Sequence, residues 1–330
     1  MKIIIIGGGV LGSSLYRLLR DRGHEVTAID ARKRKIYPTL IHSLLLKGND
    51  VKLAKRTLEL YDRFNVRTRE FPAYTISDKL GNLTSLWQEV GVKVERKYVE
   101  WLSTEATITH GSDRLVWIGN FIRSTPVYPT EAKIKLDGRK ASVELDGKIK
   151  EADAVVLAAG AWNSELFPSL KSKPYFCWSA AVSGRRELDS NFVYDYEIGF
   201  YSRPLLGMGL PFAIVGDGDT IECKPGEKVN IDPSTLLEKA SARLGKLVQF
   251  HLGWGHCEGT PDMRPSFGRV GDNLFYIGGL DGYGAEIGPA LAEMLMNYIL
   301  DGEENKEYMV DRFQQFKGSF SLGREPHELP

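Results

Sequence analysis

The sequence KIIIIGGGVLGSSLYRLLRDRGHEVTAID, from Lys2 to Asp30, decides the fold of this chain. Its opening isoleucine run is typical of a strand that is buried on both faces of a parallel sheet. Apolar residues then recur at helical spacing over Val10–Arg22, and a second strand is expected over Glu25–Asp30. Strand, helix and strand in this order predict a βαβ unit with a right-handed crossover.

The turn between the first strand and the helix carries the pattern Gly7-x-Gly9-x-x-Gly12. Gly7 permits a tight turn, Gly9 lets the backbone approach a pyrophosphate, and Gly12 lets helix and strand pack closely. The first amides of the helix then face the phosphates. Asp30 ends the second strand, where a carboxylate accepts hydrogen bonds from ribose hydroxyls. The motif predicts a dinucleotide site; the alternative is a glycine-rich turn in an ordinary α/β protein.

The length, the charge and the cysteines of the chain argue against several classes of protein. The chain has 330 residues, with 43 basic and 43 acidic side chains, which suggests two domains and gives no general attraction to nucleic acid or membranes. No apolar run approaches the roughly 20 residues of a membrane span. The three cysteines, Cys177, Cys223 and Cys257, have neither metal-site spacing nor a disulfide framework. We expect a cytoplasmic protein with no metal, no membrane span and no nucleic-acid partner.

Buried parallel strands recur far along the chain, at Ala154–Leu157 and Leu274–Ile277. The segments between them look antiparallel, with a hairpin at 132–145 and strands within Tyr175–Ser183 and Gly199–Val215. Helices are predicted over Leu53–Phe64, Leu80–Val90, Pro233–Leu244 and Pro289–Leu300. The pattern predicts a nucleotide domain built from 1–75, 132–170 and 253–330, with a second domain built from 76–131 and 171–252.

Two distant segments narrow the nucleotide to a flavin by resemblance. DAVVLAAGAW at Asp153–Trp162 and GLDGYGAEIGP at Gly279–Pro289 resemble the cofactor-facing turns of FAD-dependent oxidoreductases of the D-amino-acid oxidase and glycine oxidase (DAO) family. Thr260–Asp262 resembles the segment just before the second turn. The resemblance spans nearly the whole chain except 95–130 and the central sheet. It implies FAD and an α/β fold, with a Rossmann-type FAD-binding domain and an inserted antiparallel-sheet substrate domain.

The resemblance also suggests individual contacts with the cofactor. Glycines in the C-terminal turn permit positive φ, and amides at the start of a helix from Pro289 would face the flavin's C2 carbonyl. The alternative for this segment is a glycine C-cap followed by a loop. His42 would lie near the isoalloxazine, or else be a hydrogen-bonded structural histidine. Arg32 would lie beside the adenosine, or else be solvated. The residues expected to bind FAD are Gly7, Gly9, Val10, Leu11, Gly12, Asp30, Ala31, Arg32, His42, Ala159, Gly160, Trp162, Gly279, Asp281, Gly282, Tyr283, Gly284 and Ala285.

The substrate site departs from the family pattern. The family carries an arginine shortly before the Thr-Pro-Asp segment, where this chain has His256-Cys257-Glu258. An arginine that grips a substrate carboxylate must therefore come from elsewhere. Arg264 and Arg203 are the candidates, with Tyr201 beside the second, and each arginine could instead be a surface or ion-pair residue.

The predicted function is FAD-dependent oxidation of a C–N bond in a small amine, imino acid or amino acid, with hydride transfer to flavin N5. One alternative is oxidation of a C–O bond, as in 2-hydroxy acids. Another is a flavin-binding subunit with no activity of its own. The residues leave the electron acceptor open between oxygen, a quinone and a partner protein.

Overall fold

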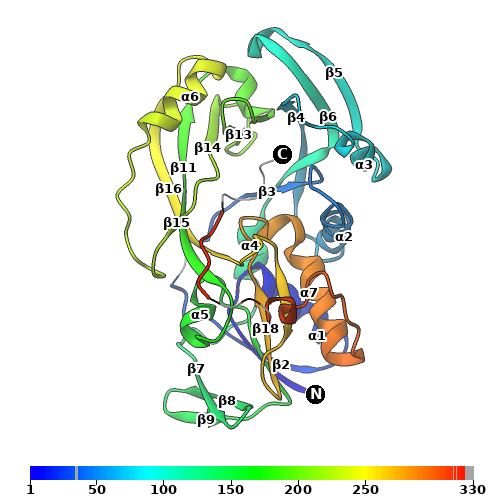
Figure 1. Cartoon of the computed structure of the whole chain (residues 1–330), viewed down its shortest axis with the longest axis vertical. Helices are drawn as coiled ribbons and strands as arrows, with labels where there is room; N and C mark the ends of the chain where they lie inside the picture. The colour runs from blue at the N-terminus through cyan, green and yellow to red at the C-terminus, as the bar shows by residue number, and fades with distance from the viewer. Residues whose placement is uncertain (34–35, 315, 317, 324–330) are drawn as a thin grey trace.

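The chain forms two large sheets and one small one, which follow one another along the long, vertical axis of the molecule in Figure 1. The computed structural model describes residues 1–33, 36–314, 316 and 318–323. Within these residues, no helix combines the length and the apolarity needed to cross a membrane. The small sheet of β7 (Lys133–Asp137), β8 (Lys140–Leu145) and β9 (Lys148–Lys150) lies at the bottom of that view and contains the expected hairpin.

The five-stranded sheet joins three distant parts of the chain in the order β17-β18-β10-β1-β2. Its four parallel strands are β1 (Lys2–Ile6), β2 (Glu25–Ile29), β10 (Ala154–Leu157) and β18 (Leu274–Gly278). The edge strand β17 (Ser266–Arg269) runs antiparallel to β18. The isoleucines of β1 are buried on both faces, as their continuous β-branched run predicts. The parallel βαβ unit is therefore confirmed.

Three helices pack together on this sheet's side of the molecule. They are α1 (Val10–Asp21), α2 (Asp50–Arg63) and α7 (Gly284–Asp301), and α7 contacts both of the others. Leu15, Leu18 and Leu19 of α1 are buried, as the helical spacing predicts. The apolar face of each helix thus forms one core with the sheet.

Helix α7 corrects the sequence prediction, because it begins at Gly284 and runs through Pro289. A proline inside a helix leaves the carbonyl four residues earlier without its helical partner. That carbonyl belongs to Ala285, and the Tyr61 hydroxyl donates a hydrogen bond to it at 2.8 Å. A side chain on α2 thus replaces the bond that the proline removes, and the helix gains a turn that proline statistics would not assign to it.

The ten-stranded sheet is antiparallel except where β12 pairs with β4, which is parallel. Its main path runs β15-β11-β14-β13-β12-β4-β6-β3, with β16 also on β11 and β5 also on β6. The strands are β3 (Leu40–Ser43), β4 (Thr68–Ile76), β5 (Lys93–Val99), β6 (Thr104–Val116), β11 (Lys173–Ser183), β12 (Phe192–Asp195), β13 (Phe200–Pro204), β14 (Phe212–Gly216), β15 (Ile221–Glu222) and β16 (Val248–Gly259). The antiparallel second sheet is confirmed.

The sheets divide the chain at other residues than the predicted domain boundaries. Strands β3 and β4 belong to the ten-stranded sheet, although 1–75 was assigned to the nucleotide domain. Helix α2 lies between them in sequence and packs against α7. The chain therefore crosses between the five-stranded sheet with its helices and the ten-stranded sheet more often than the sequence pattern predicts. We keep the two-domain organisation as a proposal, with 40–43, 68–75 and 253–259 moved to the second domain.

Short helices complete the structure. Helix α6 (Ser234–Leu244) packs its buried Leu236, Ala240 and Leu244 into a second core beside β13 and β14. The remaining helices are α3 (Leu83–Glu89), α4 (Ile118–Arg123) and α5 (Asn163–Leu166), with 3₁₀ turns at Glu100–Leu102, Gly160–Trp162, Arg186–Asp189 and Val310–Phe313.

Candidate active site

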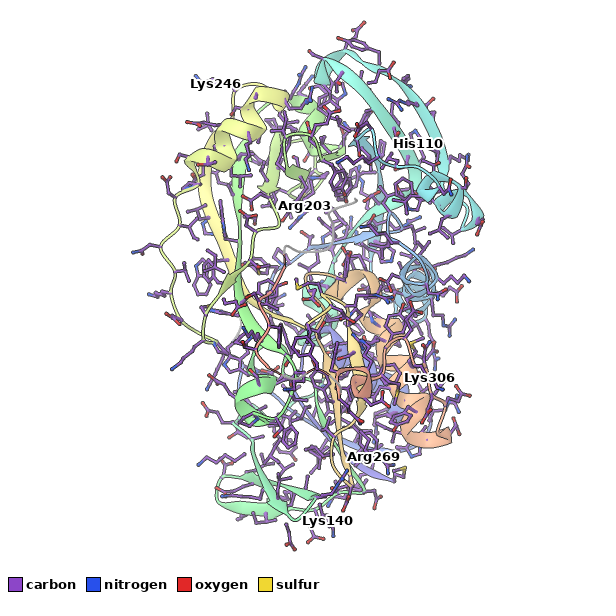
Figure 2. The ribbon with its side chains drawn as sticks, viewed as in Figure 1. His110, Lys140, Arg203, Lys246, Arg269 and Lys306 are labelled. Carbon is purple, nitrogen blue, oxygen red and sulfur yellow. The ribbon has the colours of Figure 1, made fainter. Side chains whose placement is uncertain are left out.

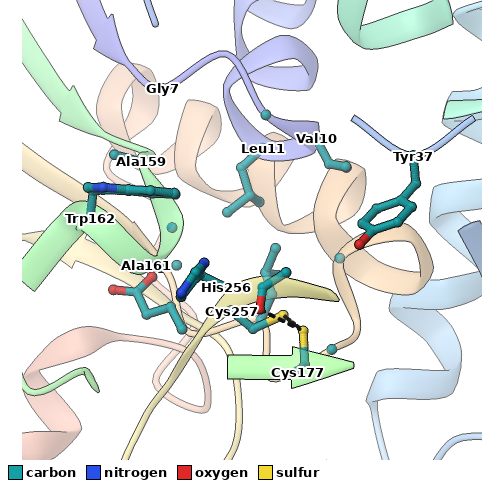
Figure 3. A pocket seen from close by; sticks show the side chains of 18 of the residues that line it. Gly7, Val10, Leu11, Tyr37, Ala159, Ala161, Trp162, Cys177, His256 and Cys257 are labelled. Atoms are coloured by element: carbon teal, nitrogen blue, oxygen red, sulfur yellow. Dashed lines mark hydrogen bonds between the residues drawn. The ribbon is translucent and has the colours of Figure 1, made fainter. Parts of the chain in front are cut away.

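A cavity of about 810 Å³ lies where the two large sheets meet. Its lining comes from the turns after β1, β2, β10 and β18, and from residues of β11, β13 and β16. Figure 3 shows Gly7, Leu11 and Trp162 on one side of it and Cys177 on another. The carboxyl edge of a parallel sheet is where ligands bind in open α/β folds. The volume falls within the roughly 300–1,000 Å³ of ligand sites.

Glycine is required at two positions of the first turn. Gly7 has φ +112°, and a Cβ there would lie 2.2 Å from the carbonyl oxygen of Ala158. A Cβ on Gly12 would lie 1.8 Å from the carbonyl oxygen of Gly7. Both contacts are with backbone, which cannot move aside cheaply. The turn therefore packs against α1 and against the end of β10 in the way that the glycine pattern predicts.

Asp30 lines the cavity and also closes this turn. Its Oδ2 accepts a hydrogen bond from the Gly8 amide at 2.6 Å, and its Oδ1 accepts one from the Arg32 amide at 2.6 Å. A carboxylate has about four lone-pair sites, so acceptor capacity remains for ribose hydroxyls. Arg32 itself is exposed and outside the cavity lining, whereas its neighbour Lys33 lines it.

The first turn of α7 lies at the cavity. Gly284, Ala285 and Glu286 of this turn line the wall, so the positive end of the helix dipole is directed there. The expected amide contact from the Pro289 end is therefore wrong in position, because the helix begins five residues earlier and Pro289 has no amide hydrogen.

A buried carboxylate links the turns after β10 and β18. Glu258 Oε2 accepts hydrogen bonds from the Gly279 amide and from Asn163 Nδ2, each at 3.0 Å. Its Oε1 accepts one from Ser172 Oγ at 2.6 Å, and Asn163 in turn accepts from the Ala159 amide. Burial raises the pKa of Glu258 to about 7. Sequence reasoning missed this residue, although it stands in the segment where the expected arginine is absent.

His42 does not lie beside the cavity, so the expected place next to the isoalloxazine is not supported. Its side chain is fully buried, and Nε2 lies 2.9 Å from the carbonyl oxygen of Ala54 in α2. Burial lowers the pKa of this imidazole to about 4. The alternative, a hydrogen-bonded structural histidine, describes what the fold places there.

Arg264 is an ion-pair residue and not a substrate clamp. Its Nη2 lies 2.9 Å from Asp50 Oδ1 and 2.8 Å from Glu307 Oε1, and it is outside the cavity lining. Through Nη2 the guanidinium joins the start of α2 to the segment after α7. The expectation that Arg264 holds a substrate is therefore corrected.

Arg203 has the opposite environment. It lies near the centre of the molecule in Figure 2 and lines the cavity with only 9% of its surface exposed. Its guanidinium donates to the carbonyl oxygen of Pro204 at 3.1 Å and to two oxygens of Thr39 at 3.4 Å. Among the described residues, no carboxylate forms an ion pair with it, and burial lowers its pKa.

Tyr201 and Arg203 share one face of β13, because side chains two residues apart on a strand point the same way. Both line the cavity. The ring of Tyr201 crosses Gly216 on the neighbouring strand, where a Cβ would lie 2.5 Å from its hydroxyl oxygen. Gly216 thus makes room for the tyrosine, a contact that depends on strand pairing and that the sequence pattern does not reveal.

Aromatic residues also border the cavity. Trp178, Trp254 and Tyr37 line the cavity, and the Tyr37 hydroxyl donates to the carbonyl oxygen of Trp254. Burial raises the pKa of Tyr37 to about 12, so its hydroxyl stays protonated. Tyr37 was not among the predicted site residues, because nothing in its local sequence marks it.

Most of the residues expected to bind FAD meet at this cavity. The lining contains Gly7, Gly9, Val10, Leu11, Asp30, Ala31, Ala159, Gly160, Trp162, Asp281, Gly282, Gly284 and Ala285. Those outside it are Gly12, Arg32, His42, Gly279 and Tyr283. Gly12 and Gly279 still shape the turns beside the cavity through backbone contacts. Contacts of these residues with FAD stay predictions. Among the described residues, no group of three or more His, Cys, Asp or Glu side chains is placed to hold a metal.

Comparisons with known proteins agree with this geometry. The family described as FAD dependent oxidoreductase (DAO) matches residues 119–298. L-proline dehydrogenase from P. horikoshii superposes with a TM-score of 0.78 at 20% identity, covering 95% of this chain and 98% of that one. Iminodiacetate oxidase from Chelativorans sp. BNC1 superposes with a TM-score of 0.74 at 18% identity, covering 93% of this chain and 98% of that one.

Glycine oxidase from Bacillus cereus ATCC 14579 gives a TM-score of 0.71 at 18% identity, covering 93% of this chain and 97% of that one. These likenesses confirm the fold, an FAD domain combined with an antiparallel-sheet substrate domain. No curated protein sequence matches the chain.

Proposed function

The chain belongs to the DAO family of FAD-dependent oxidoreductases, and from this premise we propose that it binds FAD and oxidises a C–N bond of a small substrate with a carboxylate. The substrate class is an imino acid or amino acid, with simple amines as poorer substrates. The observation that carries the proposal is Arg203, a buried guanidinium on the cavity wall without a carboxylate partner among the described residues. We place this activity in the cytoplasm.

The residues around the cavity fit the cofactor that the family implies. The Gly7–Gly9 turn and the start of α1 offer backbone amides to a pyrophosphate, and Asp30 retains acceptor sites for a ribose. The first turn of α7 directs its positive end at the cavity, where it would stabilise negative charge on a reduced flavin. When bound, FAD supplies the acceptor for a substrate hydride.

Arg203 and Tyr201 would then fix the substrate. Burying a cation without an ion-pair partner costs free energy, and a substrate carboxylate would offset that cost through two parallel hydrogen bonds. Holding the carboxylate also fixes the neighbouring carbon, which carries the hydrogen to be removed. The imine product would hydrolyse in water after release.

The test is anaerobic bleaching of the flavin absorbance by matched pairs of compounds. Proline and glycine are each compared with the amine that lacks the carboxylate, pyrrolidine and methylamine, and glycolate represents C–O oxidation. We expect bleaching by an amino or imino acid and much slower bleaching by its partner amine. Bleaching by glycolate alone would move the function to 2-hydroxy acids. No bleaching by any compound would indicate a non-catalytic flavin-binding subunit. Admitting air to the reduced protein then tests oxygen as acceptor against a quinone or a partner protein.

A further inference from the structure

Two of the three cysteines meet on the wall of the cavity. Cys177 lies on β11 opposite Gly255 of β16, and Cys257 is two residues further along β16. Side chains two residues apart on a strand share a face of the sheet, so both thiols project from the same side. Their Sγ atoms lie 3.0 Å apart, the contact drawn as a dashed line in Figure 3.

Both sulfurs are within reach of molecules that enter the cavity. Cys177 and Cys257 are half-buried and line the wall together with Tyr37 and His256. All three cysteines of the chain are thiols in the structure. The third, Cys223, follows β15 and does not line the cavity. The pair is therefore exposed to the cavity, and the proposed substrate clamp at Arg203 and Tyr201 does not use it.

The two sulfurs lie close to bonding distance. A disulfide needs the sulfurs at about 2.05 Å, so they must approach by only about 1 Å. The two strands are hydrogen-bonded neighbours on both sides of the pair, which holds the thiols together without further ordering. Once one cysteine has reacted with a small molecule, the other is already in position to displace it.

We propose that Cys177 and Cys257 form a redox-active dithiol whose substrate is a low-molecular-weight disulfide. The thiolate of one cysteine attacks a sulfur of the small disulfide, which releases one small thiol and leaves a mixed disulfide. The thiolate of the second cysteine then displaces the remaining small thiol and closes the Cys177–Cys257 bond. The protein loses two electrons and two protons, and the small disulfide gains them as two thiols.

The experiment uses the purified full chain with its cofactor and oxidised glutathione as the probe. Thiols are counted under denaturing conditions after the glutathione is removed, and the intact mass is measured without reductant. We expect three thiols before treatment and one after it, with a mass lower by two hydrogen atoms. Dithiothreitol should restore all three. The Cys223→Ser variant is the matched control and should go from two thiols to none.

Single cysteine-to-serine variants distinguish a pair of cysteines that react with each other from two thiols that are only in contact. Cys177→Ser and Cys257→Ser cannot close the internal disulfide, so at least one of them should retain a glutathionyl group as extra mass. Three persisting thiols in the treated wild type would overturn the proposal. So would a stable glutathionyl adduct on the wild type, because the second cysteine would then have failed to displace it. None of these readouts depends on oxidation of an amino acid, so failure here and failure of the proposed function are distinguishable.

Discussion

Arg203 is the residue on which the proposed substrate class depends. It is buried on the cavity wall, and its hydrogen bonds go to Pro204 and Thr39 and not to an acid. Arg264, the other candidate, forms ion pairs with Asp50 and Glu307 and lies outside the cavity lining. The sequence named both arginines, and only their three-dimensional neighbours distinguish a clamp from an ion pair.

The first residue-scale prediction concerns that clamp. Arg203→Lys keeps the charge but loses the planar fork, so kcat/KM for a carboxylate substrate should fall about 100-fold, roughly 2.8 kcal/mol. The amine without a carboxylate should react at its wild-type rate. Steady-state kinetics give the ratio of kcat/KM for the carboxylate substrate to kcat/KM for the amine. Any loss of folded protein lowers both values equally and cancels in this ratio. Arg264→Lys is the control and should leave the ratio unchanged, and an unchanged ratio in Arg203→Lys would remove the clamp.

A second prediction concerns the protonation of Glu258. Burial raises the pKa of this carboxyl group from 4.5 to about 7. Between these values the folded protein holds a proton that the unfolded chain has released, so stability falls as the pH rises through this window. The change amounts to at most about 3 kcal/mol. The Glu258→Gln variant carries no such proton. Urea unfolding from about pH 5 to about pH 8 gives the free energy of unfolding of both proteins. The value for the variant should rise relative to that of the wild type up to about pH 7. Parallel pH profiles of the two proteins would contradict this expectation.

A third concerns Gly12, which has no room for a side chain. The Cβ of alanine would lie 1.8 Å from the Gly7 carbonyl oxygen, so the turn must shift. We expect Gly12→Ala to lose about 1–3 kcal/mol of stability and most of its affinity for FAD. Fluorescence titration of apoprotein with FAD measures the second effect. Arg20→Ala, on the exposed side of the same helix, should retain wild-type affinity, and equal affinity in both variants would exclude the expected role of the turn.

At the scale of elements, α7 owes its first turn to a partner helix. Pro289 leaves the Ala285 carbonyl without a helical partner, and Tyr61 of α2 supplies the hydrogen bond. This turn presents Gly284 and Ala285 to the cavity. A hydroxyl on one helix therefore helps to position the end of another that faces the expected cofactor.

A double-mutant cycle tests this dependence. Tyr61→Phe leaves a buried carbonyl unsatisfied and should cost about 1–3 kcal/mol. Pro289→Ala restores the amide that can bond to Ala285, so Tyr61→Phe should cost clearly less in that background. Denaturant unfolding of the four proteins gives the coupling. Tyr98→Phe on the exposed strand β5 is the control for removing a hydroxyl. Equal costs in both backgrounds would show that the hydroxyl does not substitute for the missing amide.

At the scale of the molecule, the parallel sheet could be predicted from the sequence and the division between the sheets could not. Strands such as Ile3–Ile6 and Ala154–Leu157 are buried on both faces, which requires continuous apolar runs that are visible locally. Strand β3 is four residues long and pairs with Leu115 and its neighbours, so its place depends on a partner some seventy residues away. Tyr37, Gly216 and the Cys177–Cys257 contact depend in the same way on pairing between distant segments.

The flavin absorbance of the purified protein shows directly whether the chain binds FAD. We expect a yellow protein whose absorption bands belong to FAD, with FAD released intact or retained on the chain when the protein is denatured. A colourless protein that takes up no FAD when the cofactor is added to the folded chain would contradict it.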